Sequence, residues 1–135
     1  MLEKYPQQVK LVFKNFPLPS HRFATKAAIA ALAANAQGKF WEFHDALFKN
    51  YSKLDDAKIQ QIATDLGLDM VKFNSDMGDP ALETLVARDV RDGGEADVNG
   101  VPAVFINGKV LKNRSLPGFH EMITAELEKP KKATQ

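Results

Sequence analysis

The sequence predicts an α/β domain, because one β-hairpin signal stands between a long series of helical patterns and a last helix. Asn107-Gly108 is typical of a two-residue type I′ turn, in which both central residues need positive φ. The residues before it, Ala103–Ile106, are apolar and favour strand formation, so we expect a buried strand there. Between about residues 20 and 94, apolar side chains recur at the three- and four-residue spacing of amphipathic helices.

An earlier strand is predicted at Val9–Phe13, a short β-favouring run with an apolar centre. Pro17 and Pro19 follow it, and proline cannot donate to a sheet ladder. Ser20 is a candidate N-cap for a first helix. The chain is therefore expected to leave the sheet and enter a helical region near residue 20.

Five helices are predicted in this region, and the signals that delimit them are capping residues and glycines. The expected N-caps are Ser20, Asp55 or Asp56, Asp69 and Asp79, the last followed by Pro80 at the first helical position. The expected ends are Gly38, Gly67 and Gly93-Gly94. Side chains expected to face the core include Ala30, Ala34, Phe43, Leu47, Ile59, Ile62, Phe73 and Val86.

A last helix is predicted from about Pro117 to Glu128, with Phe119, Met122, Ile123 and Leu127 facing inward. The sequence contains no repeat and no linker long enough to divide it. We therefore expect one domain over residues 1–129, with a helical insertion at about 20–94, and a flexible tail over residues 130–135.

Composition excludes several classes of function. The formal net charge is +1, which favours neither nucleic acid nor an acidic membrane as a partner. The sequence has no cysteine, so a disulfide framework, a zinc–thiolate site and thiol chemistry by this chain are excluded. No apolar run approaches the roughly 20 residues of a membrane span. Glu3 and Lys4 follow directly after Met1-Leu2, so no secretory signal is expected, and the compartment stays open.

No catalytic constellation, metal site or cofactor site is predicted. His21, His44 and His120 have no second ligand at a metal-binding spacing. His44 and Asp45 are neighbours in a predicted helix, where side chains point about 100° apart, so we do not expect them to face each other. Tyr5 has no evident activating partner.

The peptide bond between Val101 and Pro102 has two open alternatives. A proline between a glycine-containing turn and a buried strand is a candidate for a cis bond, which before proline costs only about 0.5–1 kcal/mol. The other alternative is a trans proline that opens the strand, where a missing N–H does least harm.

Three stretches together resemble the DsbA-like thioredoxin-fold family. Gly100–Lys109 is similar to the family's cis-proline loop and the hairpin after it. Phe13–Leu18, followed by His21, is similar to the strand end that leads into the family's helical insertion. Gln37–Phe48 is similar to an insertion helix. The resemblance extends over about Leu2–Lys129 and implies a thioredoxin-like fold of the DsbA type, related to thiol–disulfide oxidoreductases.

The resemblance also implies what this chain lacks. The family's Cys-x-x-Cys pair lies at the start of a helix whose tail Met1–Pro6 resembles. By that comparison the domain is truncated at its N-terminus and its central strand is missing. Family members commonly act in the cell envelope.

Val101 and Pro102 are the candidate substrate-binding residues that the resemblance implies. In the family, the backbone of the residue before the cis-proline pairs with an extended substrate segment, a form of strand addition. The alternative is that Val101 and Pro102 only shape the turn.

Three functions remain open. The first is a DsbA-like domain without redox cysteines and redox-inactive as given. The second is a non-catalytic module that binds a peptide or a subunit through the cis-proline loop and the sheet edge. The third is a fragment of an enzyme similar to kappa-type glutathione transferases and a related isomerase, which use serine in place of the cysteine.

An open sheet edge predicts self-association. With the central strand missing, Val9–Phe13 and Ala103–Ile106 would expose apolar area and unpaired backbone groups. A second copy covers such a patch through a two-fold axis, so we expect a homodimer. The competing outcome is a monomer in which these two segments pair directly.

Overall fold

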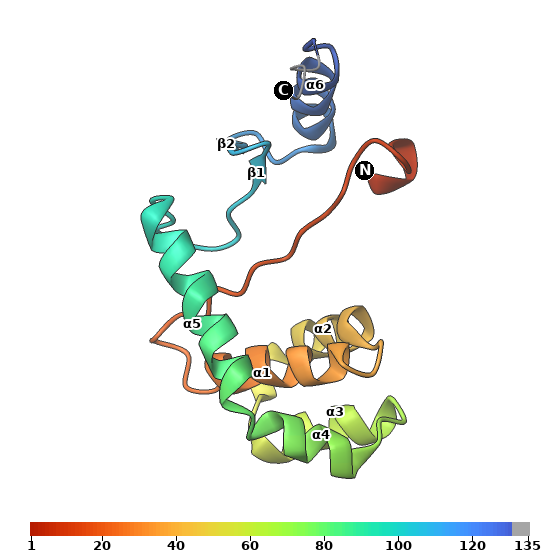
Figure 1. Cartoon of the computed structure of the whole chain (residues 1–135), viewed down its shortest axis with the longest axis vertical. Helices are drawn as coiled ribbons and strands as arrows, with labels where there is room; N and C mark the ends of the chain where they lie inside the picture. Colours follow the sequence, from red (N-terminus) through yellow and green to blue (C-terminus); the bar gives the residue numbers. More distant parts are fainter. Residues whose placement is uncertain (131–135) are drawn as a thin grey trace. The chain divides into compact units, whose positions relative to one another are not determined.

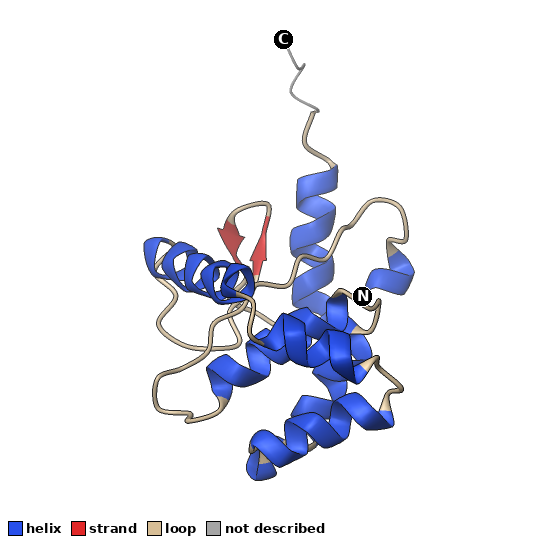
Figure 2. Cartoon of the chain, turned by 60° about the horizontal axis from the view of Figure 1, so that its bottom comes forward, coloured by secondary structure: helices blue, strands red, loops and turns tan. Residues whose placement is uncertain are grey.

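The computed structural model describes residues 1–130, which are mostly helical and include one small sheet (Figures 1 and 2). The elements in order are a 3-10 helix η1 (Leu2–Lys4), α1 (Ala24–Asn35), α2 (Phe40–Lys49), a 3-10 helix η2 (Tyr51–Lys53), α3 (Asp56–Asp65), α4 (Met70–Met77), α5 (Pro80–Glu95), β1 (Phe105–Ile106), β2 (Lys109–Val110) and α6 (Leu116–Leu127).

Two compact units make up the chain. One unit is Lys14–Asp97, which holds α1 to α5 and contains the predicted insertion. The other unit combines Met1–Phe13 with the chain from Val98 on, so it holds the hairpin and α6. The expectation of one domain over residues 1–129 stays a prediction, and the expected tail lies outside the described residues apart from Pro130.

The helical unit is built on α1, whose buried face consists of alanines. Ala30, Ala33 and Ala34 have no exposed surface. Such short side chains let α2, α4 and α5 approach α1 closely, and α2 also packs on α3. Phe43 of α2 and Phe73 of α4 fill the space between these helices, with ring centroids 5.8 Å apart. The core prediction for this region is confirmed at both positions.

Aspartate caps begin three of these helices, as the sequence predicted. The Asp55 side chain accepts a hydrogen bond from the Lys58 N–H, and Asp69 accepts one from the Lys72 N–H. Asp79 accepts from the Ala81 N–H, with Pro80 at the first helical position. Each bond satisfies one of the donors that a helix start leaves free.

One predicted helix start is wrong, and one helix end, expected near Gly93-Gly94, lies one residue further on. Ser20 caps nothing, because residues 19–23 first form turns, in which the His21 N–H bonds to the Leu18 carbonyl, and α1 begins only at Ala24. Helix α5 continues through Gly93 and Gly94 to Glu95. Neither of these glycines has the positive φ that ends a helix, and a Cβ at Gly93 would lie 2.6 Å from the Phe16 ring.

The hairpin turn is as predicted. Asn107 and Gly108 have φ of 47° and 79°, and the strands pair Phe105 with Val110 and Ile106 with Lys109. Asn107 and Lys109 both contact Glu126 of α6, at 3.4 and 2.7 Å. The turn is therefore held against α6 by one carboxylate.

The strand predictions are wrong in extent and burial. Val9–Phe13 forms no strand, and Leu11 and Val12 are half or more exposed. Only Phe105–Ile106 of the expected strand Ala103–Ile106 is in the sheet, and Phe105 is 38% exposed. Both strand predictions fail for the same physical reason. Within residues 1–130 the sheet has two strands, so no third strand covers or pairs with either segment.

Candidate functional site

The peptide bond between Val101 and Pro102 is cis, the first of the two alternatives that the sequence left open. The Val101 side chain is 50% exposed. Within residues 1–130, neither the N–H nor the carbonyl of Val101 has a hydrogen-bond partner. The loop before β1 therefore presents an unpaired donor and an unpaired acceptor to its surroundings.

The edge of β1 that faces away from β2 presents a second unpaired hydrogen-bond donor and a second unpaired acceptor. The Leu111 N–H donates to the Val104 carbonyl at 2.8 Å, so Val104 is a hydrogen-bonded position of the antiparallel pair. Positions alternate along an antiparallel strand, and Phe105 is therefore a position whose N–H and carbonyl point away from β2. Val101 and Phe105 are therefore two positions on the same short stretch of chain whose backbone groups are unpaired within the described residues, with the cis bond between them.

One face of the hairpin is apolar and exposed. Side chains alternate between the two faces of a strand, and paired positions share a face. The buried Leu111 shares its face with Lys109. Glu126 of α6 lies against that face through its contact with Lys109. Phe105 and Val110 are paired on the other face, where they are 38% and 55% exposed. A segment added to the β1 edge would have apolar side chains beside it.

Arg114 lies against the Val101–Pro102 loop. Its Nη1 donates a hydrogen bond to the Pro102 carbonyl. The residues on either side of Arg114 are held by hydrogen bonds. The Asn113 Oδ1 accepts hydrogen bonds from both the N–H and the hydroxyl of Ser115, and Ser115 caps α6. Helix α6 also lies close to Asn113, because a Cβ at Gly118 would overlap the Asn113 carbonyl oxygen. No sequence signal pointed to Arg114, since its contact with Pro102 depends on the turn between β2 and α6.

Glu126 is the strongest electrostatic feature of this unit. Its carboxylate bonds to Lys109, to Lys129 and to Asn107, and these bonds, with Lys109 the largest influence, lower the pKa of Glu126 to about 2. The same contact raises the pKa of Lys109. The ion pair therefore persists through the physiological pH range and keeps the hairpin turn on α6.

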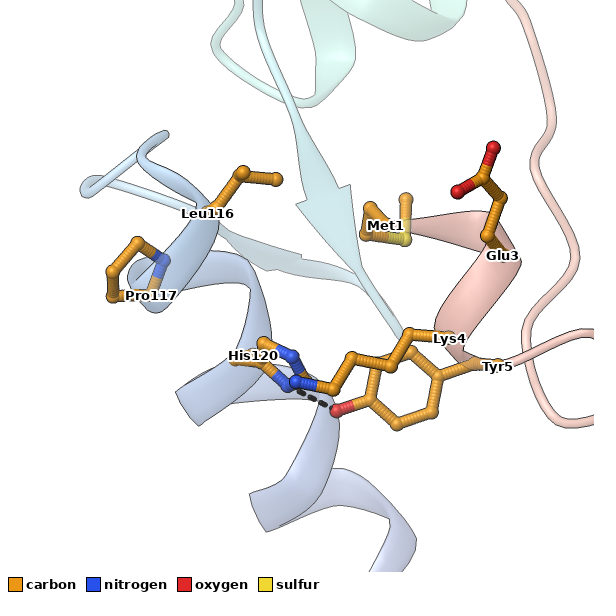
Figure 3. A pocket seen from close by; sticks show the side chains of 7 residues that line it. All are labelled: Met1, Glu3, Lys4, Tyr5, Leu116, Pro117 and His120. Carbon is orange, nitrogen blue, oxygen red and sulfur yellow. Dashed lines mark hydrogen bonds between the residues drawn. The ribbon is translucent and has the colours of Figure 1, made fainter.

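Tyr5 has a partner that the sequence analysis missed. Its hydroxyl is hydrogen-bonded to Nδ1 of His120, and the two rings meet edge to face with centroids 5.3 Å apart (Figure 3). The expectation that Tyr5 lacks a partner is wrong because the two residues are brought together only by the fold. The pair borders an open pocket of about 650 Å³, lined by Met1, Glu3, Lys4, Tyr5, Leu116, Pro117 and His120.

His44 and Asp45 do interact, contrary to expectation. The His44 Nδ1 lies 3.1 Å from the Oδ1 of the exposed Asp45 side chain. The His44 ring itself packs on Phe48, with centroids 4.7 Å apart. Among the described residues, no group of three histidine, aspartate or glutamate side chains is placed to hold a metal ion.

Several curated relatives are sodium–proton antiporters. The chain is 36% identical to Na(+)/H(+) antiporter NhaA 3 of Salinispora tropica over 102 residues, which are 75% of this chain and 16% of the antiporter. It is 32% identical to Na(+)/H(+) antiporter NhaA of Herminiimonas arsenicoxydans over 120 residues, 87% of this chain and 18% of the antiporter. The chain thus spans less than a fifth of the length of these relatives. In residues 1–130, no helix combines the length and apolar character needed to cross a membrane.

The fold and the family agree with the sequence prediction. A thioredoxin-like oxidoreductase from Silicibacter pomeroyi DSS-3 superimposes with a TM-score of 0.71, at 24% identity, over 89% of this chain and 69% of that one. This likeness, together with the family match that follows, confirms the thioredoxin-like fold of the DsbA type. The family model for the DSBA-like thioredoxin domain matches residues 1–124. The chain therefore belongs to the DSBA-like thioredoxin domain family, which is related to thiol–disulfide oxidoreductases.

Proposed function

We propose that this chain is a non-catalytic peptide-binding domain of the DSBA-like family. Val101 and Pro102, with the free edge of β1, bind an extended peptide segment. The observation that carries the proposal is the pair of unsatisfied backbone groups on Val101 and on the outer edge of Phe105. Exposed edges of this kind accept an added strand, because main-chain hydrogen bonds supply affinity without requiring particular side chains.

The relation to oxidoreductases describes lineage in this proposal. Disulfide exchange begins with attack by a thiolate, and none of the 135 residues is a cysteine. Peptide recognition requires only backbone groups and a neighbouring apolar surface, and the hairpin supplies both. We therefore assign binding to this chain and no disulfide exchange.

Nuclear magnetic resonance tests the proposal. Adding a short unstructured peptide rich in valine and threonine is expected to shift the amide resonances of Val101, Ala103 and Phe105 of the labelled protein. The matched control is the same peptide with every backbone nitrogen methylated, which removes the donors on both edges and is expected to abolish the shifts. Shifts located only in Lys14–Asp97, or equal shifts with both peptides, would contradict the proposal. In parallel, insulin reduction by dithiothreitol is expected to proceed at its uncatalysed rate.

A homodimer remains the expected assembly. Two copies can pair β1 with β1 across a two-fold axis, which satisfies the outer backbone groups of Phe105 in both copies. Light scattering at micromolar concentration is expected to give twice the 15.0 kDa mass of one chain. Since peptide and second copy use the same edge, saturating peptide is expected to return the mass to that of the monomer. A mass of one chain without peptide would contradict the dimer.

A further inference from the structure

We propose that Arg114 selects peptides that carry an acidic side chain next to the segment paired with Val101. This inference rests on the proposed function and names its substrate class. The site consists of the backbone of Val101 and the guanidinium of Arg114, joined through the carbonyl of Pro102.

The position of Arg114 follows from its contact. The guanidinium donates to the carbonyl of the residue directly after Val101. A peptide that pairs with the backbone of Val101 must therefore pass within about one residue of this group, since adjacent residues of an extended chain advance by only about 3.3 Å. Side chains of the peptide near that point come within reach of the guanidinium.

The Arg114 guanidinium has more hydrogen-bond donors than its contact with Pro102 uses. An arginine side chain carries five N–H donors in a planar fork, and the contact with Pro102 uses one of them. No aspartate or glutamate oxygen lies within 4 Å of Arg114 in the described chain. The remaining donors match a carboxylate, which accepts two parallel hydrogen bonds from such a fork.

The loop is ordered before a peptide arrives. Ser115 and Asn113 bond to each other on either side of Arg114, and Ser115 also accepts from the Gly118 N–H at the start of α6. A binding group that is already held loses less conformational entropy when a ligand docks. Arg114 therefore differs from Lys112 in the same loop, which is an exposed cation without a hydrogen bond or ion pair to the described residues.

Fluorescence polarisation with two labelled peptides tests the inference. The peptides are identical except that one carries glutamate, and the other glutamine, next to the pairing segment. Wild-type protein is expected to bind the glutamate peptide about three- to tenfold more tightly at low salt, the range of an exposed but well-oriented ion pair. The difference is expected to shrink as ionic strength rises, because salt screens exposed charges.

Two variants locate the effect. Arg114→Gln is expected to bind both peptides equally, whereas Lys112→Gln removes the same charge from the same loop and is expected to keep the preference. Thermal melting by circular dichroism checks that both variants fold. Equal binding of the two peptides by wild type, or equal loss of preference in the two variants, would overturn the inference. The inference would also be overturned if Arg114→Gln weakened the binding of both peptides by the same factor. Failure of wild type to bind either peptide would instead overturn the proposed function.

Discussion

Replacing Phe43 with alanine is expected to lower the free energy of unfolding by about 3–5 kcal/mol. The Phe43 side chain has no exposed surface and packs on the Phe73 ring at the centre of the helical unit. Its removal forfeits apolar burial and leaves a cavity among α1, α2 and α4, where the alanines of α1 are too short to fill it. Natural domains are stable by only about 5–15 kcal/mol, so the loss is large.

The control for this prediction lies on the same helix. Phe48 is 65% exposed, so Phe48→Ala removes the same number of atoms without creating a cavity. We expect its effect to stay within about 0.5 kcal/mol, as for most surface substitutions. Urea denaturation followed by circular dichroism gives both values. Equal losses for the two variants would show that Phe43 is not at the centre of the core.

Replacing Asp89 with alanine is expected to cost about 1.5–3 kcal/mol, the range for a hydrogen bond to a charged group. The Asp89 Oδ2 accepts from both the backbone N–H and the side-chain amide of Asn15, each at 2.9 Å. Both residues are buried. Without the carboxylate, the two Asn15 donors lose their partner inside the protein, where water replaces it poorly.

Asp92 is the matched control, one turn further along α5. Its carboxylate pairs with Lys14 at 3.0 Å, and this bond lowers the pKa of Asp92, yet its side chain is 37% exposed. Asp92→Ala changes helix propensity by the same amount as Asp89→Ala and is expected to cost less than about 1 kcal/mol. A cost at Asp92 equal to that at Asp89 would contradict the view that burial makes the Asn15–Asp89 hydrogen bonds the stronger contribution to stability.

The family and most helices followed from the sequence because their signals are local. The caps Asp55, Asp69 and Asp79 bond to backbone N–H groups within three residues, so the bonds form wherever a helix starts. The Asn107-Gly108 turn needs only positive φ at two adjacent residues, which these residue types tolerate. The buried positions Phe43 and Phe73 followed from spacing along their own helices.

Tertiary structure alone decided the strands and the site. A strand exists only where a neighbour accepts its hydrogen bonds, so the β-favouring run Val9–Phe13 is outside the two-stranded sheet of the described residues, and only Phe105–Ile106 of Ala103–Ile106 lies in it. Arg114 reaches Pro102, and Asp89 reaches Asn15, across 12 and 74 positions of the sequence. Periodicity and capping rules extend over a few residues, whereas contacts of this kind depend on how the chain returns on itself.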